Sequence, residues 1–181
     1  VFAIQDEIAN EVVAALKISL LGEAAETMDR DQTNDLDAYT DYLLGLNALD
    51  RASTENLSRA IGHLEAAIAH DPEYARAWST LGRTYITMEG YGALSLEESA
   101  AAARHAASKA LDLVPESSEA LAVLGMAEIL DANYDEAGRI LQKAAELGPN
   151  DAVAIGYYGQ YLLGAARPQE AIAMFEKAAR L

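Results

Sequence analysis

SEALAVLGMAEILDANYDEAGRILQKAAELGPND, residues 118–151, and AVAIGYYGQYLLGAARPQEAIAMFEKAARL, residues 152–181, carry the strongest structural signal in this chain. Small and turn-forming residues recur through these stretches at one constant separation. Pairs that lie 34 positions apart are Gly125 and Gly159, Pro115 and Pro149, Ala137 and Ala171, and Ala144 and Ala178. A fixed period of this order is the mark of a structural unit that repeats along the chain. The sequence therefore predicts a repeat protein.

The same landmarks continue towards the N-terminus, with insertions. Gly82 and Gly125 are 43 positions apart, and Gly45 precedes Gly82 by 37. The residues of the expected second helices keep their mutual spacing, so we expect the additional residues in the turn between the two helices of a hairpin. Residues 90–92, GYG, lie within the longer insertion and are typical of a loop.

One repeat carries a characteristic set of residues. Trp78, Leu81, Gly82 and Tyr85 are spaced as Trp-x2-Leu-Gly-x2-Tyr, and they are followed by Ala103, Ala110 and Pro115. Together with the 34-residue period, this set resembles the tetratricopeptide repeat (TPR) family. The resemblance implies an all-α protein, a right-handed α-solenoid of four helical hairpins. The expected TPR domain, residues 38–181, divides into repeats at about 38–74, 75–117, 118–151 and 152–181.

The pattern also predicts how the hairpins pack. Trp78, Leu81 and Tyr85 recur at i, i+3 and i+7, which places them on one face of a helix. Gly and Ala stand where helices would cross closely, because a larger side chain would hold the backbones apart. A single hairpin cannot bury its apolar face alone, so stability is expected from stacking. We expect Trp78 to be buried, and its replacement by Ala to cost roughly 3–5 kcal/mol.

Residues 1–28 precede the repeats and are predicted to form an amphipathic helix. Apolar side chains recur every four positions along one side of it: Ile4, Ile8, Val12, Leu16 and Leu20. Such a helix would either cap the first hairpin or serve coupling and dimerisation. Residues 29–37, DRDQTNDLD, are predicted to be a polar, acidic connector with a helix N-cap near Asp35 or Asp37.

The N-terminal part carries a second resemblance. Residues 2–9, FAIQDEIA, followed by Ala38-Tyr39-x-x-Tyr42-Leu43-x-Gly45, are similar to the C-terminal TPR region of certain bacterial signalling proteins. Those proteins carry a nucleotide-cyclase or winged-helix DNA-binding domain upstream. The resemblance implies that this chain is the sensory or scaffolding part of such a protein. The chain begins with Val1 rather than Met, so we expect it to be a fragment.

The composition excludes several classes of function. Asp and Glu number 29 against 13 Lys and Arg, which gives a net charge of −16. Nucleic acids and anionic membranes both need a positive surface, so we expect neither as a partner. The chain has no Cys and no apolar run long enough to span a bilayer. The compartment stays open: the cytoplasm is the default expectation, and a signal or anchor upstream is the alternative.

No arrangement of residues predicts catalysis or metal binding. The sequence has no nucleophile elbow, phosphate loop, zinc-protease motif or dinucleotide fingerprint. His63 and His70 share a helix face but stand two turns apart, with only alanines between them on that face. Asp29, Asp31 and Asp35 lack the Gly and the Glu of a calcium loop. We therefore expect no enzyme, no cofactor and no metal site.

The TPR resemblance implies that the second, fifth, ninth, twelfth and thirteenth positions of each repeat face a concave groove. These positions hold many apolar residues, two arginines and few acids, and Tyr, Met and Arg are enriched at interface cores. The candidate partner-binding residues are Tyr39, Tyr42, Leu46, Arg76, Ser79, Arg83, Met126, Leu130 and Gln160. The sequence thus predicts a scaffold that binds a partner peptide or helix. The alternatives are self-association that couples copies of an upstream domain, and small-ligand sensing.

The groove differs from that of TPR proteins that bind chaperone tails, which carry Lys and Asn at the fifth and ninth positions. Here those positions hold Tyr42, Leu46, Ser79, Arg83, Ala122, Met126, Gly156 and Gln160. The comparison implies a partner other than a chaperone tail. Arg83 could still pair with one carboxylate of a peptide. Surface charge or pairing within the chain is the alternative for Arg76 and Arg83.

Overall fold

The computed structural model describes residues 33–181, which form eight helices and no strand. In chain order these helices are α2 (Leu36–Asp50), α3 (Thr54–His70), α4 (Ala75–Gly90), α5 (Leu96–Leu113), α6 (Ser118–Leu130), α7 (Tyr134–Leu147), α8 (Ala152–Gly164) and α9 (Pro168–Ala178). The predicted all-α solenoid of helical hairpins is confirmed in this part of the chain. The helix predicted at residues 1–28 lies outside the described residues, as do residues 29–32 of the acidic connector.

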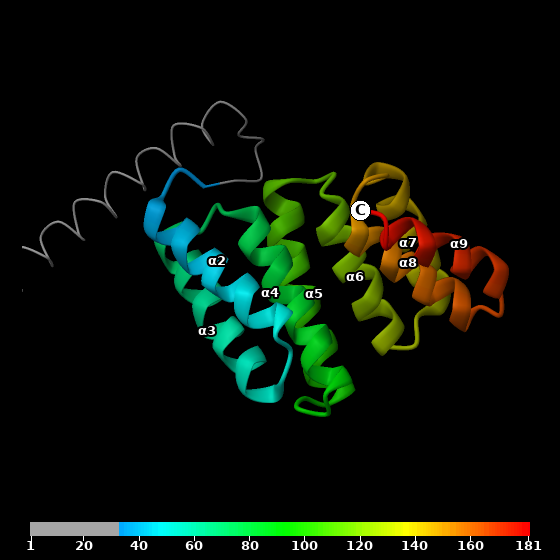
Figure 1. The fold of residues 1–181 in the computed structure, drawn as a ribbon, viewed down its shortest axis with the longest axis horizontal. Helices are drawn as coiled ribbons and strands as arrows, with labels where there is room; N and C mark the ends of the chain where they lie inside the picture. The colour runs from blue at the N-terminus through cyan, green and yellow to red at the C-terminus, as the bar shows by residue number, and fades with distance from the viewer. Residues whose placement is uncertain (1–32) are drawn as a thin grey trace, which may run out of the picture.

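Consecutive helices pair into hairpins, and the hairpins stack in chain order from α2–α3 to α8–α9 (Figure 1). The first helices of the hairpins contact one another, α4 with both α2 and α6, and α6 with α8. Within residues 33–181 the second helices make no comparable contact with each other. Helices that touch lie on the inner side of a curved stack. The concave face is therefore formed by α2, α4, α6 and α8, and the convex face by the second helices.

Side chains fix the points at which several helices begin. Asp35 caps α2 by accepting two backbone N–H bonds, as the sequence predicts. Ser95 and Glu98 form a capping box at the start of α5, and Asp151 caps α8. Pro168 occupies the first turn of α9, where its missing N–H group costs nothing. These caps provide partners for N–H groups that the first turn of a helix leaves unbonded.

The insertions lengthen helices more than turns, contrary to the sequence-based expectation. Helices α4 and α5 have 16 and 18 residues, against 13 and 14 in α6 and α7. The connection after α4 runs only from Tyr91 to Ser95, and Gly90 still belongs to the helix. Gly92 has a φ of +67°, which suits glycine and makes the sharp turn. Lengthening by about one helical turn preserves the periodicity of both helices, so the sequence pattern did not reveal it.

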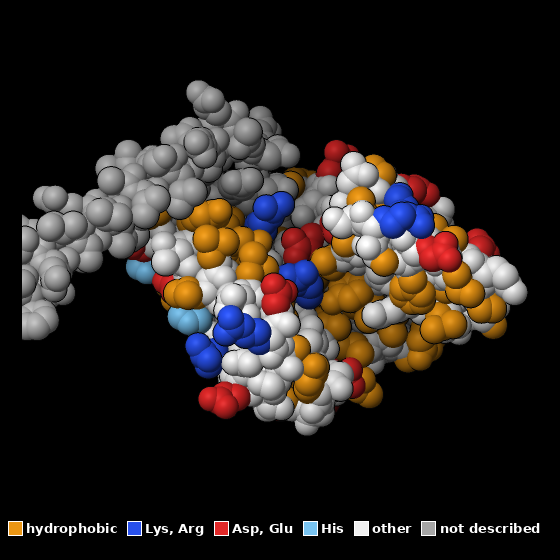
Figure 2. Space-filling view, viewed as in Figure 1, with side chains coloured by type: hydrophobic (Ala, Val, Ile, Leu, Met, Phe, Trp, Pro, Cys, Tyr) orange, Lys and Arg blue, Asp and Glu red, His pale blue; other side chains and the backbone are white. Residues whose placement is uncertain are grey.

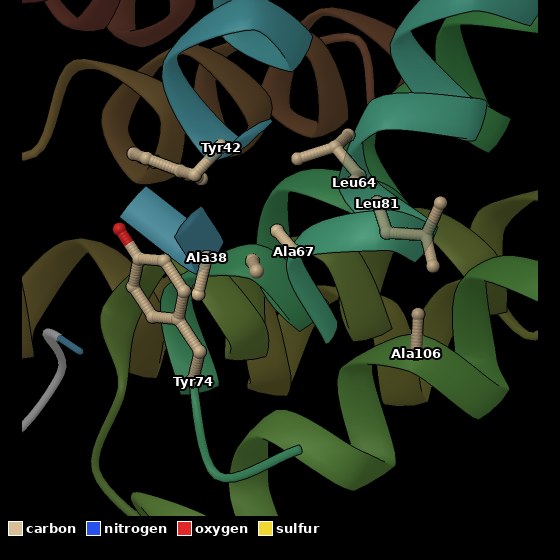
Figure 3. Packing of buried hydrophobic residues seen from close by; sticks show 8 residues of the cluster. Ala38, Tyr42, Leu64, Ala67, Tyr74, Leu81 and Ala106 are labelled. Carbon is tan, nitrogen blue, oxygen red and sulfur yellow. The ribbon is translucent and has the colours of Figure 1, made fainter. Parts of the chain in front are cut away.

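Tyr74, rather than Trp78, is the aromatic side chain that the stack buries most deeply. Tyr74 directly precedes α4, is 1% exposed, and lies with its ring centroid 5.1 Å from that of Tyr42 (Figure 3). Trp78 is only half-buried, at the edge of the same cluster beside His105 of α5. The expectation of a buried Trp78 is therefore wrong. Its replacement by Ala is expected to cost about 2 kcal/mol, because part of the ring already meets water.

Two glycines allow helices to approach closely. A Cβ atom at Gly82 would lie 2.7 Å from Cγ1 of Val123, and one at Gly125 would lie 2.5 Å from Cγ of Leu141. Val123 and Leu141 are both fully buried, so neither can move aside easily. The predicted role of glycine at close helix crossings is confirmed at these positions.

The last hairpin is the least buried part of the stack. In α9 only Ala171 is buried, while Ile172 and Phe175 are 56% and 36% exposed. Leu163 at the end of α8 is also 56% exposed. Within residues 33–181, none of the helices combines the length and apolar character needed to cross a bilayer.

Candidate interaction groove

Four of the nine predicted groove residues line one hollow on the concave face: Tyr42, Arg76, Ser79 and Arg83. The hollow has a volume of about 530 Å³. Its remaining walls come from the starts of α6 and α8, from the end of α7 and from the connections before α6 and α8. Residues contributing to these walls include Ser117, Ser118, Glu119, Asn150, Asp151 and Val153.

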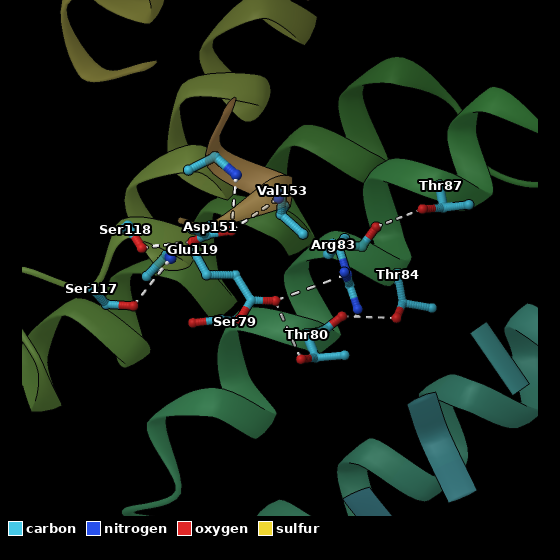
Figure 4. Close-up of polar contacts among 12 residues, drawn as sticks. Ser79, Thr80, Arg83, Thr84, Thr87, Ser117, Ser118, Glu119, Asp151 and Val153 are labelled. Atoms are coloured by element: carbon cyan, nitrogen blue, oxygen red, sulfur yellow. Dashed lines mark hydrogen bonds and ion pairs between the residues drawn. The ribbon is translucent and has the colours of Figure 1, made fainter. Parts of the chain in front are cut away.

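An ion pair joins α4 to α6 in this hollow. Arg83 Nε lies 3.9 Å from Oε1 of Glu119, and the Thr80 hydroxyl donates to the same oxygen at 3.5 Å (Figure 4). The Arg83 and Glu119 side chains are only 22% and 20% exposed. Arg83 is thus engaged inside the protein, one of the alternatives that the sequence left open. Among the described residues, its Nε is also a buried nitrogen without a hydrogen-bond partner.

The surroundings of this ion pair are poorly hydrated. Burial raises the pKa of the Glu119 carboxyl, against the opposing influence of Arg83. Burial likewise raises the pKa of the Tyr42 hydroxyl, and it raises the pKa of Tyr157 on α8 to about 12. Coulombic attraction is stronger where water is excluded. The raised pKa nevertheless means that burying the charged Glu119 carboxylate costs more than the attraction of Arg83 returns.

Glu119 and Asp151 were absent from the predicted set, although both line the hollow. Asp151 Oδ1 accepts the backbone N–H of Val153 at 2.9 Å, and Oδ2 accepts the hydroxyl of Ser118 at 2.6 Å. This aspartate ties the connection before α8 to the start of α6. Glu119 occupies the second position of its repeat, which the repeat register predicts to face the groove. The sequence marks Asp151 only as a helix cap.

Arg76 is the cation of the hollow that faces solvent. It lies in the first turn of α4 and is exposed, and within residues 33–181 it forms no ion pair. Glu119 and Asp151 are both directed to internal partners. The charge that an approaching ligand meets first is therefore positive.

The other predicted residues lie outside the hollow. Tyr39 and Leu46 are half-buried against the cluster around Tyr74, and Gln160 is exposed on α8. Met126 is 8% exposed and belongs to a core cluster, against which Leu130 is partly buried. Met126 therefore packs in the interior and does not line the hollow. Figure 2 shows hydrophobic side chains spread over the C-terminal half of the face in view, and charged side chains in patches at its middle and on both sides.

A cluster of histidines and acids lies on α2 and α3. Asp41 faces two histidines, with His63 Nδ1 at 3.0 Å and His70 Nε2 at 3.7 Å from its carboxylate oxygens. One ligand atom from each of Asp35, Asp37 and His70 also lies within 4.8 Å of the others. Sequence reasoning missed this cluster because the acids come from the neighbouring helix. All three side chains are exposed, and Asp35 Oδ1 accepts two backbone N–H bonds, so capping and surface pairing account for the arrangement.

Stacked hairpins with small residues at their crossings define a helical-repeat protein with the fold of TPR proteins. A thermophilic TPR protein of Thermus thermophilus matches with a TM-score of 0.64 and 19% identity, covering 98% of this chain and 86% of that one. The first TPR of Spaghetti (RPAP3), solved with the HSP90 peptide SRMEEVD, matches with a TM-score of 0.57 and 16% identity. That match covers 75% of this chain and 98% of the other. At these identities the likeness shows the fold alone.

Similarity in sequence extends to one kind of regulatory protein. The chain is 24% identical over 178 residues to the transcriptional regulator HilA of Salmonella typhimurium. The match covers 98% of this chain and 32% of HilA, so the chain spans about a third of the length of that relative. No known family profile matches the chain.

Proposed function

We propose that the chain is a docking module that holds a partner peptide or helix in its concave groove, and that it acts by binding rather than by catalysis. The observation that carries the proposal is the hollow in which Arg76 faces solvent beside Tyr42 and Ser79. Arginine can hold a carboxylate through two parallel hydrogen bonds. A partner with an acidic side chain opposite Arg76 fits this arrangement best.

A solved neighbour supports a peptide as the occupant, because the RPAP3 domain was solved with a peptide. The partner differs in kind from that HSP90 peptide. The fifth and ninth positions of the repeats here lack the Lys and Asn of chaperone-binding TPR proteins. A binding site discriminates between partners by which of their polar groups it can hydrogen-bond or pair with. Without those Lys and Asn side chains, a chaperone tail would lose most of its hydrogen bonds and ion pairs to the groove.

We further propose that this docking serves a bacterial regulatory protein. The similarity to the transcriptional regulator HilA supports this context, and so does the resemblance of the N-terminal segment to TPR regions of bacterial signalling proteins. The chain would then be the part that receives a protein signal for a domain elsewhere in the same polypeptide.

A peptide-display experiment tests the docking proposal. A library of random linear peptides is selected on the chain, and enriched peptides are titrated by fluorescence anisotropy. We expect peptides with an acidic residue to bind, and Arg76→Glu to weaken them at least tenfold. Arg59→Glu, an equal charge change at an exposed position on α3, should leave binding unchanged. Equal binding by the Arg76→Glu variant and the parent chain would rule out the groove as the site.

Self-association is the second candidate function, and the exposed apolar side chains of α9 favour it. Ile172 and Phe175 lie on a helix that buries only Ala171. Light scattering at several protein concentrations tests this candidate. A dimer that dissociates on Ile172→Glu would support it, whereas a monomer at all concentrations would contradict it.

A further inference from the structure

A second hollow lies on the convex side of the molecule. It is bounded by Glu65 on α3 and His105 on α5, and its floor is formed by Trp78, Leu81 and Tyr85 of α4. Its volume is about 290 Å³, and it shares no lining residue with the concave hollow. A space of this size suits one long side chain rather than a drug-sized ligand.

Two aromatic rings line this pocket. Trp78 and Tyr85 lie seven residues apart on α4, which is about two turns, so they project from the same face. The indole N–H of Trp78 donates to the carbonyl of Pro72 at 3.0 Å, and the ring lies 6.0 Å from that of His105 in an edge-on arrangement. The polar edge of the indole is thus occupied within the protein. What the half-buried rings offer a ligand is their electron-rich surface.

Glu65 supplies a negative charge at the same place. Its side chain is exposed, and within residues 33–181 it takes part in no ion pair. Burial, and secondarily the nearby Glu65 carboxylate, raise the pKa of the Tyr85 hydroxyl. The pocket therefore combines two ring faces, an apolar floor and a carboxylate that has no cationic partner in the described part of the chain.

We propose that this convex pocket binds the cationic side chain, arginine or lysine, of a basic protein segment. A cation is attracted to the faces of Trp and Tyr, and the attraction grows when the cation leaves water. The aliphatic stem of such a side chain can lie on Leu81 while its charged end meets Glu65. The net charge of −16 draws a basic segment towards the whole molecule, and the pocket gives it a defined place to bind.

This proposal is independent of docking in the concave groove, and the two surfaces select opposite charges. The concave hollow presents Arg76 to solvent, whereas the convex pocket presents Glu65 and aromatic rings. One partner with acidic and basic segments, or two different partners, could therefore occupy both faces of the solenoid at once.

Trp78 provides the test, because it is the only tryptophan in the chain. The full chain is titrated with a glycine–serine peptide that contains one arginine, and with the same peptide containing citrulline, which has the same shape without the charge. Tryptophan fluorescence and the single indole N–H resonance are followed at fixed ionic strength. We expect a saturable change with the arginine peptide and none with the citrulline peptide.

Matched variants separate the pocket from the general acidity of the protein. Glu65→Gln should weaken the arginine peptide at least fivefold, and Glu97→Gln, an exposed acid in the first turn of α5, should leave the affinity unchanged. Tyr85→Leu keeps an apolar side chain in the core and should also weaken binding, with circular dichroism reporting the fold. Equal responses to arginine and citrulline, equal losses in Glu65→Gln and Glu97→Gln, or the lack of a saturable response would each overturn the proposal.

Discussion

Helices α4 and α6 hold equivalent places in successive hairpins, yet they present different chemistry to the groove. At the second, fifth and ninth positions α4 carries Arg76, Ser79 and Arg83, and α6 carries Glu119, Ala122 and Met126. Ala122 and Met126 are buried, whereas Arg76 is exposed. A solenoid fixes the residues that stack its repeats and leaves the groove positions free to differ. Glu119 departs from the apolar character of α6 because it completes the polar cluster of α4.

Arg83→Met tests this difference most severely, because it gives α4 the residue found at the equivalent position of α6. We expect a loss of about 3 kcal/mol in unfolding free energy at neutral pH, since Glu119 would remain largely buried without its cationic partner. Urea denaturation followed by circular dichroism measures the change.

A double variant sharpens the same comparison. Adding Glu119→Val, which supplies the residue at the equivalent position of α8, should recover most of the stability, because an ion pair can often be replaced by apolar side chains without loss. Breaking a buried ion pair usually costs several kcal/mol. A loss of unfolding free energy under about 1 kcal/mol in Arg83→Met alone would therefore mean that the pair does not hold α4 against α6.

Glycine substitutions probe the stack rather than the groove. Gly125→Ala should cost roughly 1–3 kcal/mol, because the added Cβ would press on buried Leu141. Gly156→Ala should instead stabilise the protein by roughly 0.5–1 kcal/mol, because it lies within α8 and its Cβ would meet open space. The midpoint temperatures of thermal unfolding of the two variants test this prediction. A shift of both midpoints in the same direction would show that Gly125 does not mark a close crossing.

The smallest expected effect is on the pH dependence of stability. The pKa of Glu119 is raised in the folded state, so the folded protein holds this proton more tightly than the unfolded chain. The contribution of Glu119 to the free energy of unfolding is fully present below its unfolded-state pKa. This contribution is lost as the pH rises through the folded-state pKa. Relative to the parent chain, Glu119→Gln should therefore gain stability as the pH rises above about 4.3, the ordinary glutamate pKa. Denaturation curves at several pH values measure the difference, and a constant difference would contradict the prediction.

Much of the fold could be predicted from spacing, because only glycine fits at a close helix crossing such as that of Gly125. The repeat register also brought Tyr42, Arg76, Ser79 and Arg83 to the concave face, where they meet in one hollow. The contribution of Asp151 was missed because it depends on how one hairpin rests on the next. The exposure of Trp78 was misjudged because periodicity identifies a helix face but not how far the neighbouring helices cover it.

The longer second hairpin shows in what steps a solenoid can grow. Helices α4 and α5 exceed α6 and α7 by three and four residues, about one turn each, so every side chain keeps its angular position. An addition of two residues within one helix would rotate all later side chains by about 200° and turn an apolar face towards water. The end of this hairpin is supported, since Met88 belongs to one buried cluster with Leu57 of the first hairpin, and Leu94 packs against that cluster. The length of the second hairpin can thus change by whole helical turns, while the hollows on either side of α4 stay as they are.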